Sequence, residues 1–153
     1  MKEDSKVYMY AALEEARIAL SHGDVPVGCV IVKDGIIIGR GHNRREELHD
    51  ASAHAEIEAI RDACRRTESW RLQDALLYVT LEPCPMCAGG ILNARIAAIY
   101  YGAKEPKMGC CGSVLNIFEE RFHHHPRIYG GILESECAGL LQEFFEEKRS
   151  RND

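Results

Sequence analysis

The sequence predicts an α/β domain built as a three-layer α/β/α sandwich around a mixed sheet of about five strands. An Asp34-Gly35 pair separates two β-branched runs, which is the pattern of a tight β-hairpin. After the hairpin, helical and strand patterns alternate, as they do when parallel strands are joined by crossover helices. The chain has 153 residues, the length of one domain, so we expect residues 1–153 to form a single domain.

The first elements follow from apolar periodicity. Residues 4–22 predict a helix, because apolar side chains recur on one face and His22-Gly23-Asp24 ends the pattern. The hairpin strands are expected at residues 27–33 and 36–38. Residues 39–52 are polar and irregular, so they predict a loop.

The second helix is expected to begin close to His54, with Asp50 or Ser52 as its cap. Its predicted core face consists of Ala53, Ile57, Ile60 and Cys64.

A nearly apolar strand is predicted over residues 75–81, as expected where both faces of a strand are covered. Pro85 suits the first position of a helix, which we expect to end near Ala94. Residues 96–101 predict the next strand. The loop at residues 102–113 is long for a compact domain, and such loops are more often functional than idle.

The C-terminal third predicts a short helix over residues 115–121, a short strand over residues 127–129 and a final helix over residues 134–149. The final helix carries an apolar stripe that we interpret mostly as core: Cys137, Leu140, Leu141, Phe144 and Phe145.

Composition limits the classes of protein that fit. Seven cysteines, with Cys110 and Cys111 adjacent, indicate reduced thiols in a cytoplasmic protein rather than a disulfide framework. No apolar run approaches the length of a membrane helix, and the first residues do not resemble a signal peptide. The net charge of −5 means that contacts with a nucleic acid have to come from a local basic patch.

A metal-binding pattern joins the two central helices. Cys84 and Cys87 are one helical turn apart, and with His54 they offer three ligands and leave the fourth tetrahedral position open. Three protein ligands with an open position are typical of a catalytic Zn²⁺ site, so we expect one zinc per chain. Glu56 lies two residues after His54 and can act beside the metal without binding it. The order H-x-E…P-C-x-x-C is the signature of zinc-dependent nucleobase deaminases.

Other interpretations of these residues stay open. The two cysteines could form a redox dithiol, and the zinc could stabilise a binding module that has no catalytic activity. Glu56 argues against the binding module, because a structural zinc site has no use for an unligated carboxylate. A second metal could in principle bind Cys110 and Cys111 together with the histidines at residues 123–125, although small residues between glycines explain the cysteine pair equally well.

From the hairpin to the last helix the chain resembles bacterial tRNA-specific adenosine deaminases, of the cytidine deaminase-like superfamily. The stretches that carry this resemblance cover nearly the whole chain and are Val25-Pro26-Val27-Gly28, Gly41-His42-Asn43-Arg44, Ala53-His54-Ala55-Glu56, Leu76-Leu77-Tyr78-Val79-Thr80-Leu81-Glu82-Pro83-Cys84, Met86-Cys87-Ala88-Gly89, Tyr101-Gly102-Ala103, Gly112-Ser113 and Gly131-Ile132-Leu133-Glu134-Ser135-Glu136-Cys137.

The resemblance implies a zinc held by His54, Cys84 and Cys87, a proton shuttle at Glu56 and a hydrogen bond from Asn43 to the target nucleotide. It also implies hydrolytic deamination of the wobble adenosine of a tRNA anticodon to inosine by a cytoplasmic homodimer that binds the anticodon stem-loop. The alternative is a free nucleobase or nucleoside deaminase of the guanine or cytidine type.

The chain departs from the family pattern at two places. Residues 123–126 read His-His-His-Pro where the family usually has Asn-His, and Glu105 replaces a shorter polar residue near the substrate. Our candidates for phosphate contacts are Lys104 and Lys107, followed by the basic residues at 148–151.

Overall fold

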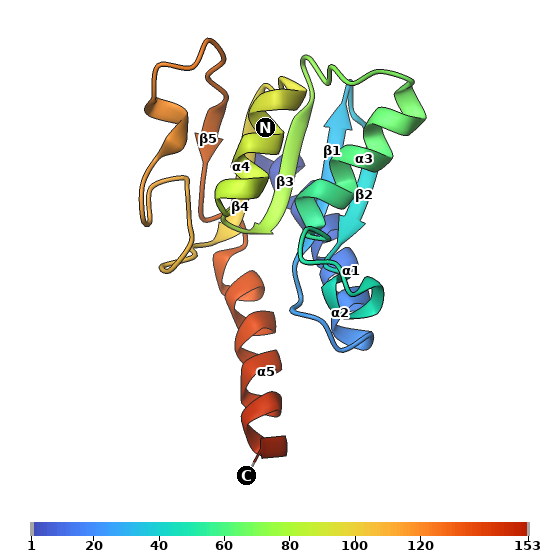
Figure 1. Ribbon diagram of the computed structural model, residues 1–153, viewed down its shortest axis with the longest axis vertical. Coiled ribbons are helices and arrows are strands. Elements are labelled where there is room, and N and C mark those ends of the chain that lie inside the picture. Colours follow the sequence, from blue (N-terminus) through green and yellow to red (C-terminus); the bar gives the residue numbers. More distant parts are fainter. Residues whose placement is uncertain (1, 153) are drawn as a thin grey trace.

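A five-stranded mixed sheet forms the middle layer of the protein in the computed structural model, which describes residues 2–152 (Figure 1). The strands are β1 (Gly28–Lys33), β2 (Ile36–His42), β3 (Leu76–Leu81), β4 (Ala98–Ala103) and β5 (Arg127–Tyr129). Their spatial order is β2-β1-β3-β4-β5. β1 is antiparallel to β2 and to β3, whereas β3, β4 and β5 run parallel. The predicted fold class is therefore confirmed.

Helices cover both faces of the sheet (Figure 1). α1 (Lys2–Ser21) and α5 (Glu134–Asn152) lie on one face, and α3 (Ala55–Thr67) and α4 (Pro85–Ala94) lie on the other. The side chains of β1 alternate between the two cores, because successive residues of a strand point to opposite faces. Cys29 and Ile31 pack towards α3 and α4, and Val30 packs towards α1.

The hairpin turn has the backbone that its sequence demands. Asp34 (φ 52°) and Gly35 (φ 76°) both adopt left-handed conformations, as a two-residue turn matched to the strand twist requires. The second strand, however, is longer than predicted. β2 continues to His42, and the short helix α2 (Arg45–Leu48) follows it where an irregular loop was expected.

Close approach of α3 to the edge strand β2 explains why the strand continues through Gly39 and Gly41. A Cβ atom on Gly41 would lie 2.4 Å from the carbonyl oxygen of Ala55, so only glycine leaves room for the helix. The buried apolar face of α3 is correspondingly made of the small residues Ala55, Ala59 and Ala63. The predicted face was wrong in this respect, since Ile57 and Ile60 are only partly buried at its margin.

The chain after β4 is mostly irregular until α5. Residues 104–116 form a loop, and the predicted helix at residues 115–121 is reduced to the single 3₁₀ turn η1 (Ile117–Glu119). α5 begins against the sheet and then extends well beyond it (Figure 1). Its apolar stripe is core only at its start, because Cys137 is buried whereas Phe145 is 45% exposed.

None of the helices within residues 2–152 has the length and apolarity needed to cross a membrane.

Candidate metal centre and pocket

Two helix N-termini meet at the end of the central strand β3. β3 ends at Leu81, and Pro83-Cys84-Pro85 turn the chain directly into α4. Cys84 is the N-cap of α4, with an extended backbone (φ −79°, ψ 175°), and Pro85 occupies the first helical turn. His54 is the N-cap of α3 and is likewise extended (φ −80°, ψ 151°). The sequence therefore presents ligand side chains from two adjacent helix starts.

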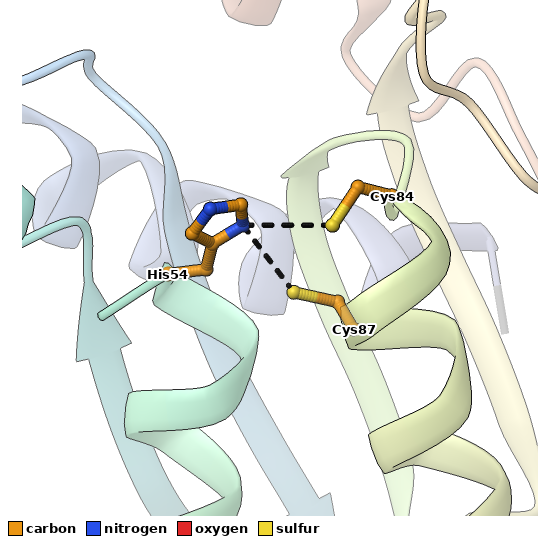
Figure 2. Close-up of side chains that lie close together, drawn as sticks. All are labelled: His54, Cys84 and Cys87. Carbon is orange, nitrogen blue, oxygen red and sulfur yellow. Dashed lines mark hydrogen bonds between the residues drawn. The ribbon is translucent and has the colours of Figure 1, made fainter. Parts of the chain in front are cut away.

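The three predicted ligands lie together (Figure 2). His54 Nδ1 is 3.6 Å from Cys84 Sγ and 3.5 Å from Cys87 Sγ. Zn–N and Zn–S bonds of about 2.1 and 2.3 Å at a tetrahedral angle would place nitrogen and sulfur about 3.6 Å apart. Both the donor set and its spacing therefore fit zinc.

Within residues 2–152 this is the only cluster of three or more His, Cys, Asp or Glu side chains that could hold a metal ion. The ring of His124 hydrogen-bonds the Ile96 carbonyl (2.7 Å), and that of His125 hydrogen-bonds the Phe118 carbonyl (2.9 Å). His123 instead bonds the Arg95 guanidinium (3.2 Å). Among the described residues, the structure therefore gives no support to a second metal site with Cys110 and Cys111. All seven cysteines are free.

Hydrogen bonds among the three candidate ligands shift their pKa values. Two hydrogen bonds lower the pKa of Cys84 to about 4, although burial opposes them. The bond from the Cys87 thiol has the larger effect and the bond from His54 the smaller. The hydrogen bond to Cys84 raises the pKa of His54. The hydrogen bond to Cys84, followed by burial, raises the pKa of Cys87. A divalent cation would replace these shared protons, and metal affinity would then rise with pH.

Glu56 is buried beside this cluster on the first turn of α3, with 4% of its surface exposed. Burial raises the pKa of its carboxyl to about 7, although hydrogen bonds to its own backbone N–H and to Cys87 partly oppose this rise. A carboxyl with such a pKa can accept and return a proton near neutral pH.

Asn43 is buried between the hairpin and α3, and both ends of its amide bond to backbone. Its Oδ1 accepts from the backbone N–H of Ala55 (2.9 Å), and its Nδ2 donates to the carbonyl of Val25 (3.1 Å). Asn43 therefore caps α3, whereas the predicted caps do not. The Asp50 carboxylate instead accepts hydrogen bonds from the backbone N–H and the hydroxyl of Ser52. Neither the Asp50 nor the Ser52 side chain caps α3.

A pocket of about 370 Å³ opens beside the cluster, within the range usual for small-molecule sites. Its polar lining consists of Asn43, Arg45, His54, Glu56, Glu82, Cys84 and Glu105, and its apolar lining of Val25, Val27, Leu81, Met108 and Phe145. His54, Cys84, Glu56 and Asn43 thus surround one space.

The sequence by itself does not place three polar or aromatic lining residues, Arg45, Glu82 and Phe145, in this pocket. Glu82 is singled out there only within a stretch that carries the family resemblance, yet a carboxylate between a buried strand and a metal ligand signals a buried polar site. Phe145 was interpreted as core, and Arg45 as part of a solvated loop. No short sequence pattern indicates either of these positions.

The fold and the ligand cluster define a deaminase, and comparison with known proteins agrees. Residues 3–149 match the MafB19-like deaminase family. The tRNA-specific adenosine deaminase of Bacillus subtilis is 47% identical over 147 residues, which cover 95% of this chain and 91% of that protein. The chain belongs to the family of tRNA-specific adenosine deaminases.

Two solved structures are informative neighbours. One comes from a study of A-to-I editing by tRNA:A34 deaminases at the wobble position of transfer RNA. It has a TM-score of 0.84 and 49% identity, covering 87% of this chain and 97% of that one. A guanine deaminase from Bacillus subtilis has a TM-score of 0.61 and 42% identity, covering 64% of this chain and 63% of that one.

Proposed function

We propose that this protein is a zinc-dependent hydrolase that converts adenosine to inosine at the wobble position of a tRNA anticodon. Residues 1–153 act as a single zinc-dependent deaminase domain in the cytoplasm. The observation that carries the proposal is the placement of a zinc-compatible ligand cluster and a buried carboxyl in one pocket. The similarity to curated tRNA-specific adenosine deaminases over most of both chains supports the choice of substrate.

His54, Cys84 and Cys87 would hold one Zn²⁺ per chain. When bound, zinc lowers the pKa of water towards 7 and so makes a nucleophile available at neutral pH. Glu56 accepts a proton from the attacking water at its carboxylate and passes it to a ring nitrogen of adenine. It then takes the remaining proton from the oxygen now bonded to C6 and delivers it to the leaving amine. Addition of water at C6 and loss of ammonia balance the conversion of adenosine to inosine.

Asn43 is our candidate for binding the target nucleotide. Its amide lines the pocket and keeps one N–H and one lone pair beyond its two backbone bonds. Because those bonds fix the amide, a base hydrogen-bonded to it would be held at a defined position beside Glu56.

Basic and aromatic groups adjoin the pocket on the side of α5. A second surface hollow shares Val25 and Arg45 with the pocket and is also lined by Phe144, Lys148 and Arg151. Bases can stack on such aromatic rings while cations contact the phosphates, as single-stranded nucleic acids require. This arrangement favours the basic residues of α5, which line the adjoining hollow, over Lys104 and Lys107, which line neither the hollow nor the pocket.

The substrate proposal is tested with an anticodon stem-loop that carries adenosine at the wobble position. We expect inosine at that position, because an anticodon loop presents its bases unpaired, and almost no product from free adenosine, cytidine or guanine. The control is the same loop with its adenosine moved by one position. Comparable turnover of free guanine and the stem-loop would contradict the proposal and favour the guanine deaminase alternative.

We further propose that the protein is a homodimer. Exposed apolar side chains at the start of α4 and in the neighbouring loop support this proposal: Met86 (39% exposed), Val114 (55%) and Leu115 (50%). Cys110 N–H donates to the carbonyl of Pro83 (2.9 Å), so these two segments lie side by side.

Sedimentation should therefore give a mass of about twice the 17.2 kDa of one chain. Leu115→Lys should shift the protein towards monomers, because a charge would have to be buried in the interface. A wild-type mass of one chain at micromolar concentration would contradict the dimer.

A further inference from the structure

Glu82 links the metal-binding segment to the long loop after β4. It follows β3 directly, precedes Cys84 by two residues and is 2% exposed. Its Oε1 accepts from the backbone N–H of Glu105 (3.1 Å) and from the hydroxyl of Ser113. Its Oε2 accepts from the backbone N–H groups of Cys111 (2.9 Å) and Ser113 (3.1 Å). One buried carboxylate thus satisfies three loop amides and one loop hydroxyl.

The loop closes around this carboxylate. A Cβ atom on Gly109 would lie 2.4 Å from Glu82 Cδ, so the loop can pass this close only with glycine there. Residues 104–116 contain no helix or strand, apart from an isolated bridge between Cys111 and Asn116. No regular backbone ladder fixes their shape, which depends on the Glu82 bonds together with scattered backbone bonds such as that from the Gly109 N–H to the Glu105 carbonyl (2.9 Å). Without the carboxylate, the N–H groups directed at it would lose their partners.

The anchored loop forms one wall of the pocket. Glu105 and Met108 line the space beside His54, Glu56 and Cys84. The backbone of Glu105 is itself held by Glu82, so the carboxylate acts directly on a pocket residue. Two links then set the position of the wall relative to the zinc ligands: the Glu82 carboxylate, and the hydrogen bond from the Cys110 N–H to the Pro83 carbonyl (2.9 Å).

We propose that Glu82 is a positioning residue for deamination, which holds residues 105–113 as the wall against which the target nucleotide fits. This proposal rests on the deaminase function proposed above. Glu82 acts through the loop and not through zinc binding or proton transfer, since its oxygens are occupied by loop donors.

The variant Glu82→Gln tests the proposal, because its amide NH₂ would face at least one backbone N–H donor and lose at least one hydrogen bond. We expect KM for the anticodon stem-loop to rise about tenfold or more, with kcat within about threefold and one zinc per chain retained. The ligands and Glu56 are untouched, so a substrate once bound would react normally. Ser113→Ala removes one bond from an exposed loop residue and should shift KM in the same direction by a smaller factor. It also keeps the test available if Glu82→Gln does not fold.

Asp62→Asn is the matched control. Asp62 is also a buried carboxylate, accepting from the backbone N–H of Arg40 (2.9 Å) and bonding Arg65 and Arg66, but it does not line the pocket. This substitution should lower the melting temperature and leave KM unchanged. An equal rise in KM for this control, or an unchanged KM in both test variants, would overturn the positioning role. Loss of zinc from Glu82→Gln would also overturn it.

Amide hydrogen exchange gives a readout that does not depend on activity. In Glu82→Gln the amides of Glu105, Cys111 and Ser113 should exchange at least about tenfold faster, whereas amides of α1 should not change. If the wild-type protein fails to deaminate the stem-loop, the proposed function fails, yet this measurement still decides whether Glu82 holds the loop. Unchanged exchange at the three amides would refute the anchoring itself.

Discussion

Replacing Glu56 by Gln is expected to lower deamination of the stem-loop by about 10²–10⁴-fold while zinc content and fold are retained. The carboxyl is buried with a pKa raised to about 7, so it can both take up and release a proton. Glutamine has nearly the same shape but cannot carry that proton. The expected signature is a fall in kcat with about one zinc per chain, measured on the same preparation by elemental analysis.

Glu58→Gln provides the control on the same helix. Glu58 lies two residues further along α3 and faces Arg44 and Arg61, each at 4.0 Å, rather than the pocket. The same chemical change there should leave kcat nearly unaltered, since partly exposed ion pairs contribute little. If Glu56→Gln instead lost its zinc, Glu56 would be a ligand and the proton-transfer role would be wrong.

The positions that could be predicted from sequence are those whose geometry is local. Cys84 and Cys87 are separated by one helical turn, and His54 and Glu56 occupy the start of one helix, so each pair is arranged by its own backbone. The Asp34-Gly35 turn is local in the same sense. The two pairs meet because both helices begin at the same end of the sheet. The predicted alternation of strands and helices already implied that placement.

What could not be predicted depends on partners distant in sequence. The four donors to Glu82 lie 23 to 31 residues further along the chain, in a segment without periodicity. Asn43 caps a helix that begins twelve residues later, which no local capping pattern encodes. The predicted strand ends at residue 38 because residues 39–52 are polar and irregular. In the structure, however, Gly39 and Gly41 let α3 pack on the continued strand β2.

The limits of apolar periodicity are clearest on α5. A stripe that includes Cys137, Leu141 and Phe145 satisfies the pattern of a core-facing helix along its whole length. The sheet ends before the helix does, so the same face is core at Cys137 and pocket lining at Phe145. Periodicity specifies which residues share a face, but only the length of the neighbouring layer decides where that face is covered.

Removing the sulfur of Cys87 is expected to cost the protein both its zinc and its activity. Cys87→Ala leaves two ligands, His54 and Cys84, and a site with two protein ligands has lost the arrangement of a catalytic zinc centre. Wild-type protein should contain about one zinc per chain, the variant close to none, and turnover of the stem-loop should fall to background.

Cys110→Ala is the matched control for this loss. It removes another buried thiol, from the loop beside Pro83, but that thiol is not part of the ligand cluster. It should keep about one zinc per chain and most of the activity.

Stoichiometric zinc in Cys87→Ala would refute the ligand assignment. Two zinc ions per wild-type chain, falling to one in Cys110→Ala, would instead establish a second site at Cys110 and Cys111. If the wild-type chain holds a single zinc that Cys87→Ala loses and Cys110→Ala keeps, the His-Cys-Cys cluster is the metal centre.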